Sequence, residues 1–196
     1  MIDNIRLLLQ IITVDFFIAF GLYTILYLLI SIFIKSPKLS KIDEEVVHFI
    51  SSAGVVYFLV WIIGLCIFYV ESNLEEQISM TNRMFGKYWV GFWLQPILWF
   101  VVTQLLRLKK VSKNIFFRVI FSFILIISIE RFVIIVISFH GDYLPSFWTM
   151  YNDLDIYPSN YLLALLMKII FFLLCVGIYY LVKNQIIIFT KTKIEN

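Results

Sequence analysis

Charged residues are scarce in this chain of 196 residues, and so are the residue types that bind metals. Asp, Glu, Lys and Arg make up 15% of the sequence, 62% of the residues are hydrophobic, and the mean hydropathy is +0.94. Soluble domains have about 25% charged and about 45–50% apolar residues. The composition therefore excludes an ordinary soluble domain and predicts an all-α, polytopic membrane protein.

The sequence has only two histidines and two cysteines. His48 and His140 are expected at opposite membrane surfaces, too far apart to ligate one haem. Cys66 and Cys175 lie within apolar segments and outside any Cys-x-x-Cys spacing, so we expect both to be small core residues. A glycine-rich phosphate loop and a Ser/His/Asp arrangement are also missing. We therefore expect no metal or cofactor within the chain, and any redox centre on a partner subunit.

Five apolar segments are long enough to cross a hydrocarbon core of about 30 Å, which takes about 20 helical residues. They span residues 11–34, 46–70, 88–107, 115–139 and 161–183. The loops are short, so we expect a single transmembrane domain, residues 1–196, made of a four-helix bundle plus one helix. No cleavage site follows the first segment, which is expected to act as its own anchor. Glycines within the segments are expected to let helices approach closely: Gly21, Gly54, Gly64, Gly91 and Gly177.

Lysine and arginine are distributed unevenly over the two sides of these segments. Eleven lie in the 35–45 loop, the 107–118 loop and the tail from residue 183, and three lie on the opposite side. Because cytoplasmic loops carry the excess of basic residues, the N-terminus is predicted outside and the C-terminus in the cytoplasm. The net charge of +3 is a topology signal and predicts no nucleic-acid binding.

Glu130 and Arg131 lie deep in the fourth apolar segment. An ionisable side chain near the bilayer centre costs at least about 2.5–3.5 kcal/mol, so such residues are functional candidates. Glu130 is expected about 15 Å below His140, which Asp142 follows. Neighbouring helical residues point in different directions, so each member of the Glu-Arg pair needs a partner on another helix. Lys168 is the predicted partner of Glu130.

Two interpretations of these residues remain open. In one, the charges form a structural ion pair that fixes how the helices align. In the other, Glu130, His140 and Asp142 belong to a polar path for protons, since membrane proton relays are built from Asp, Glu and His. Asp15, near the outer end of the first segment, either joins this path or faces the lipid headgroups.

Residues 130–148 carry the most distinctive motif of the chain: Glu130-Arg-Phe-Val-Ile-Ile-Val, then Ser138-Phe-His140, then Asp142-Tyr-Leu-Pro145-Ser-Phe-Trp148. This run resembles the NrfD-type (polysulfide reductase) membrane subunits, in particular the quinol-site membrane subunit of bacterial alternative complex III. Residues upstream agree with the resemblance in the same order: Asn82, Arg83, Gly86, Tyr88, Trp89, Trp93, Gln104, Lys109 and Lys110.

The resemblance implies a multi-pass subunit of the bacterial inner (cytoplasmic) membrane that supports quinol oxidation and is inactive alone. Menaquinol or quinone would be the substrate of the whole complex. Iron–sulfur clusters and c-type haem would belong to partners, namely a periplasmic iron–sulfur subunit and a multihaem cytochrome c. The resemblance implies that Glu130, Arg131, His140 and Asp142 lie in the second helical bundle, as part of a proton path or its support.

The sequence also departs from the family. Gly141 stands where Arg is usual, Lys87 where Pro is usual, and Trp99 and Thr103 where Asn and Pro are usual. The resemblance covers only the C-terminal half of such subunits, whose N-terminal bundle forms most of the quinone pocket. A separately encoded N-terminal half or a shortened gene would account for this. The alternatives to a quinol-oxidising role are a non-catalytic membrane anchor that docks an iron–sulfur module, and a small transporter.

Overall fold

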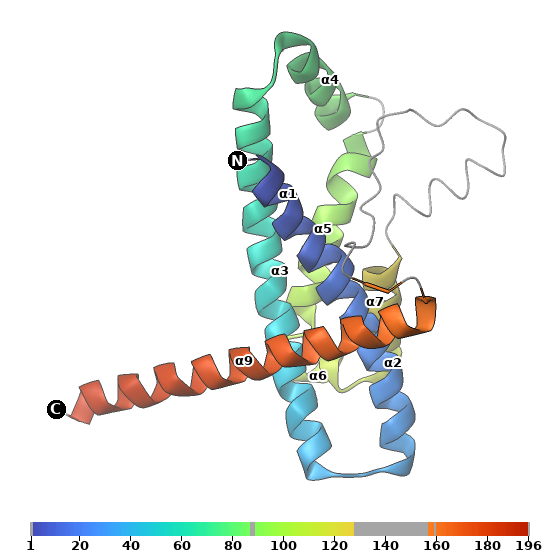
Figure 1. Cartoon of the computed structure of the whole chain (residues 1–196), viewed down its shortest axis with the longest axis vertical. Helices are drawn as coiled ribbons and strands as arrows, with labels where there is room; N and C mark the ends of the chain where they lie inside the picture. The colour runs from blue at the N-terminus through green and yellow to red at the C-terminus, as the bar shows by residue number, and fades with distance from the viewer. Residues whose placement is uncertain (1, 87–88, 128–156, 159, 196) are drawn as a thin grey trace.

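The computed structural model describes residues 2–86, 89–127, 157–158 and 160–195, and the regular structure in these residues is all helical (Figure 1). Three helical stretches are long and apolar enough to cross a membrane: Asp3–Phe33, Pro37–Glu71 and Leu162–Thr190. Two further apolar helices are shorter, at Phe92–Leu105 and Ile115–Ile126. The described residues thus confirm an all-α protein with membrane-spanning character.

The first apolar segment forms one continuous helical run from three pieces. These are α1 (Ile2–Gln10), the π-helical stretch η1 (Ile11–Phe17) and α2 (Ile18–Phe33). The run ends where Ile34 turns to an extended conformation, with φ −122° and ψ 100°.

The second helix, α3 (Pro37–Glu71), begins well before the predicted residue 46. Ser36 caps it by accepting a hydrogen bond from the Lys38 backbone N–H at 3.3 Å, and Pro37 occupies the first turn, where a missing N–H costs nothing. Residues 37–45 are too polar for a hydropathy pattern to include them. The predicted boundary marked the start of the apolar surface and missed the start of the helix.

The predicted outer loop at 71–87 contains a helix that was not predicted, α4 (Leu74–Phe85). Asn73 and Glu76 form a reciprocal capping box at its start. After it come α5 (Trp89–Leu105), the short α6 (Lys109–Ser112) and α7 (Ile115–Ile126). The predicted fourth segment continues to residue 139, but residues 128–139 lie outside the described part of the chain.

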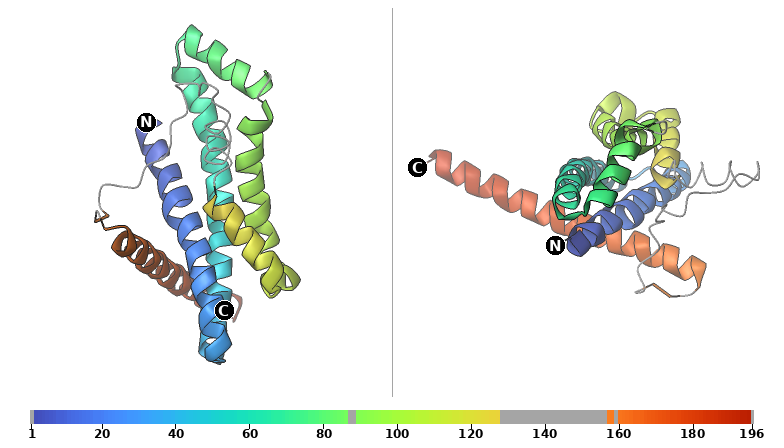
Figure 2. Two further views of the ribbon diagram at one scale, coloured as in Figure 1. Left: turned by 90° about the vertical axis from the view of Figure 1, so that its right-hand side faces the viewer. Right: turned by 90° about the horizontal axis from the view of Figure 1, so that it is seen from above.

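The last helix, α9 (Tyr161–Glu195), extends well past the predicted end at residue 183. The first helical run and α3 lie side by side, with α5 against α3 and α7 against α2 (Figure 1). Helix α9 crosses α2 and α3 obliquely and projects beyond the other helices, as the two turned views also show (Figure 2).

The interior is held together by buried aromatic side chains from different helices. Phe17, Tyr57 and Trp99 meet edge to face, with ring centroids 5.4 to 5.6 Å apart. The Trp99 indole N–H also donates to the backbone carbonyl of Ile124 at 3.1 Å, which ties α5 to α7. Such aromatic pairs add about 0.5–1.5 kcal/mol beyond the area that they bury.

Close helix packing depends on glycine at two of the expected positions. A methyl group added to Gly54 would lie 2.0 Å from the Thr103 hydroxyl, and one added to Gly21 would lie 2.4 Å from Ile126. The expectation is wrong for Gly177, because no described residue lies within 4 Å of a methyl group added there. Helix α9 makes no such close approach there.

Candidate functional site

Four of the residues singled out in the sequence lie outside the described part of the chain: Glu130, Arg131, His140 and Asp142. Their proposed path, and the pairing of Glu130 with Lys168, therefore stay predictions. The two secondary candidates, Asp15 and Lys168, are both described and both buried, with 0% and 2% of their surface exposed. Asp15 thus lies inside the protein. Of the two positions that the sequence left open, it does not take the one that faces the lipid headgroups.

Asp15 lies on η1, the only π-helical turn among the described residues. A π-helical stretch widens the backbone ladder, and short ones within α-helices are frequent at functional sites. Within this stretch, the Thr13 hydroxyl donates a hydrogen bond to the backbone carbonyl of Leu9, one turn earlier, at 2.8 Å. Phe17, two residues after Asp15, is anchored in the aromatic interior. The local structure therefore holds the Asp15 carboxylate within the protein.

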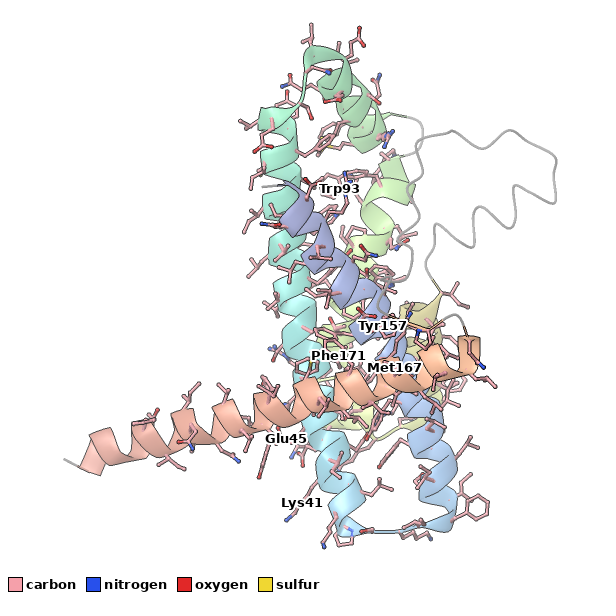
Figure 3. All side chains as sticks on the ribbon, viewed as in Figure 1. Lys41, Glu45, Trp93, Tyr157, Met167 and Phe171 are labelled. Atoms are coloured by element: carbon pink, nitrogen blue, oxygen red, sulfur yellow. The ribbon has the colours of Figure 1, made fainter. Side chains whose placement is uncertain are left out.

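Tyr157 links Asp15 to Lys168. The Tyr157 hydroxyl donates a hydrogen bond to Oδ1 of Asp15 at 2.8 Å, across 142 residues of sequence. The Lys168 ammonium lies 5.1 Å from the centroid of the Tyr157 ring, within cation–π distance. Tyr157 lies beside the first turns of α9, where this helix crosses the N-terminal run (Figure 3). We call Asp15, Tyr157 and Lys168 the carboxylate cluster.

The carboxylate cluster contains one hydrogen bond along which a proton could move, from Tyr157 to Asp15, while Lys168 lies against the tyrosine ring. A tyrosine hydroxyl both donates and accepts hydrogen bonds, so it can give its proton to a carboxylate and take one from the other side. A buried carboxylate without such contacts would be costly. Asp15, Tyr157 and Lys168 therefore keep an ionisable group inside a part of the protein that is otherwise apolar.

A second buried polar group lies where the polar start of α3 meets α7. The Arg118 guanidinium binds Asp43 in a bidentate ion pair, in which Nη1 donates to Oδ2 at 2.6 Å and Nη2 donates to Oδ1. Tyr23 donates its hydroxyl proton to the same carboxylate at 3.4 Å, and the guanidinium lies 5.0 Å from the centroid of the Tyr27 ring. Arg118 also donates to the Ser112 carbonyl at 3.3 Å.

Sequence reasoning missed this Asp43–Arg118 ion pair because it counted Arg118 as a loop cation. The side chain is in fact 3% exposed. A usable signal was present: Arg118 lies within the apolar run that starts at Ile115, and Asp43 lies just before the run that starts at Val46, on the same predicted side. Two opposite charges at equal depth are candidates for a pair, although spacing alone does not choose between Asp43, Glu44 and Glu45.

Within the described ranges, no group of three His, Cys, Asp or Glu residues could hold a metal ion. His48 is exposed on α3. Cys175 is half-buried, but Cys66 is exposed, so the expectation that both cysteines are core residues is wrong for Cys66.

The long apolar helices and their buried ionisable groups define the chain as a helical membrane protein. Comparison with protein-family models, curated proteins and solved structures gives no match.

Proposed function

We propose that the chain is a membrane subunit of a quinol-oxidising respiratory complex like alternative complex III, and that it carries protons through its interior. The observation that carries the proton role is the hydrogen bond from Tyr157 to the fully buried Asp15, with the buried Lys168 beside the same ring. Ionisable residues within membrane helices are costly and are kept for ion pathways or proton relays.

The quinol-oxidising role is supported by the motif at residues 130–148, which resembles the NrfD-type membrane subunits. In this proposal Glu130, Arg131, His140 and Asp142 continue the path that the carboxylate cluster begins. Electrons from menaquinol pass to the iron–sulfur and c-type haem centres of partner subunits, and the released protons leave through the buried acids.

The proposal includes five membrane spans in the bacterial inner membrane, with the N-terminus outside. Helices α5 and α7 are apolar but shorter than the other three candidates, and α7 ends where Ile127 turns to an extended conformation, so counting them as spans is part of the proposal. This topology is testable by attaching a periplasmic or cytoplasmic reporter after each segment. If the periplasmic reporter were active at the C-terminus and the cytoplasmic reporter were not, this topology would be contradicted.

The functional test uses the chain within its complex, in membranes that oxidise menaquinol. Tyr157→Phe removes only the hydroxyl that donates to Asp15, and Asp15→Asn removes the titratable group. We expect Asp15→Asn and Glu130→Gln to lower quinol-dependent electron transfer about 100-fold, the lower end of what a positioned proton-transfer group contributes. Tyr157→Phe is expected to lower it less and to increase the solvent isotope effect.

Ser122→Ala is the matched control, because Ser122 is also buried but donates only to the Arg118 carbonyl of its own helix, at 2.8 Å. It is expected to leave turnover unchanged. Full turnover of Asp15→Asn in an assembled complex would refute the proton role. Copurification without any iron–sulfur or haem partner would refute the respiratory assignment.

A further inference from the structure

A pocket of about 430 Å³ lies between α2, the first turns of α3 and the α6–α7 segment. Its size falls within the usual range for ligand pockets, about 300–1,000 Å³. The charged groups of its lining are Asp43, Glu44, Arg107, Lys109, Lys113 and Arg118. The pocket lining thus carries four positive and two negative charges.

The negative charges of this pocket are already engaged. Asp43 is held by Arg118, and Glu44 lies 3.8 Å from the Lys109 ammonium in a pair that is largely exposed. For Arg107 and Lys113, both exposed, no ion pair is found among the described residues. The pocket therefore offers two cationic side chains to an anion from outside the chain.

The depth of the pocket corresponds to that of lipid phosphates. Helix α3 is about 52 Å long at 1.5 Å per residue, well beyond a hydrocarbon core of about 30 Å, so its polar start lies outside the core. The lining includes Asp43 and Val47, on either side of the change from polar to apolar sequence. The pocket thus lies where headgroups meet acyl chains.

An apolar surface adjoins the cationic side of the pocket. Ile115 lines it and is 66% exposed, and the next residue, Phe116, is 68% exposed. A free phosphate ion would make no contact with this surface. A molecule that has both a phosphate and hydrocarbon chains would cover it.

We propose that this pocket binds the headgroup of an anionic phospholipid, with the phosphate between Arg107 and Lys113 and an acyl chain along Ile115 and Phe116. Basic pockets between membrane helices on the cytoplasmic side are suited to such headgroups. This inference is independent of the quinol-oxidising role, because it depends only on the charges and the depth of the pocket.

The test measures lipid retention by the purified full-length chain in detergent micelles, read by native mass spectrometry. Phosphatidylglycerol and phosphatidylcholine with identical acyl chains are the probes, so only headgroup charge differs. We expect the native chain to prefer phosphatidylglycerol. Arg107→Gln combined with Lys113→Gln is expected to lower that preference about thirtyfold, since each basic residue near anionic lipid contributes a factor of about five.

Lys35→Gln combined with Lys38→Gln is the matched control, because both residues are exposed, lie on the same predicted side and are absent from the pocket lining. It is expected to keep the preference. Equal retention of the two lipids by the native chain would overturn the proposal, as would an equal loss in the control. Displacement of the lipid by inorganic phosphate would show that the pocket takes a free anion, and would also overturn it.

Discussion

The buried Asp43–Arg118 ion pair provides the sharpest test of how the helices are held together. Arg118→Met removes the charge but keeps much of the side-chain volume. Because the side chains are 3% and 12% exposed, Asp43 would be left as a buried charge without its partner. Breaking such a pair costs about 3–5 kcal/mol. We therefore expect Arg118→Met to lower the free energy of unfolding by this amount.

A double-mutant cycle separates the pair from its surroundings. Asp43→Asn, Arg118→Met and the double variant are compared by unfolding the full-length chain in detergent micelles and following helix content by circular dichroism. The double variant should be less destabilised than the sum of the single variants, with a coupling of about 2–3 kcal/mol. Additive single effects would refute the argument.

The two acids that follow Asp43 serve as internal controls. Glu44 lies 3.8 Å from Lys109, with side chains 57% and 80% exposed, so Glu44→Gln should cost at most about 1 kcal/mol. Glu45 accepts from the Lys183 ammonium at 2.8 Å, with side chains 22% and 33% exposed, and Glu45→Gln should fall between the two. If Glu44→Gln lowered the free energy of unfolding as much as Asp43→Asn, burial would not determine the cost of breaking these pairs.

Three further outcomes are expected. Gly54→Ala should lower the free energy of unfolding by about 1–3 kcal/mol, because the new methyl group would collide with Thr103 on α5. Gly177→Ala should leave it unchanged or raise it by up to about 1 kcal/mol. Equal effects of the two variants in the same unfolding assay would contradict the packing described. Trp99→Phe should cost at least about 1 kcal/mol through loss of the hydrogen bond to Ile124, and an unchanged unfolding midpoint would count against that bond. The purified chain should show no b-type haem Soret band, and such a band in an absorption spectrum would overturn the argument from its two histidines.

The helical class and the apolar segments could be predicted because hydropathy acts locally along the chain. Helix limits were missed, because a hydropathy pattern does not detect the capping residues at which a helix starts. Ser36 and Pro37 start α3 within polar sequence, and the capping box at Asn73 starts α4 in what was expected to be a loop. Neither start changes the apolar pattern.

For the candidate site, the sequence predicted two of the residues but not the contacts between them. The single acid in the first apolar segment identified Asp15, and the single base in the interior of the last one identified Lys168. Their surroundings depend on Tyr157, which is 142 residues from Asp15 in sequence. Contacts of this kind are decided by tertiary packing, which no local pattern encodes. The same holds for the choice of Asp43 as the partner of Arg118.

Consecutive acids at the start of α3 bind three different helices: Asp43 binds α7, Glu44 approaches α6, and Glu45 binds α9. Successive residues of an α-helix point about 100° apart, so the three pairs lie on three different sides of α3. A turn of α3 by one residue would move each carboxylate to its neighbour's direction and break all three pairs together. Further along the helix, Gly54 and Tyr57 pack closely against α5. The acids add to this packing three charged contacts that depend on both the rotation and the height of α3 relative to the other helices.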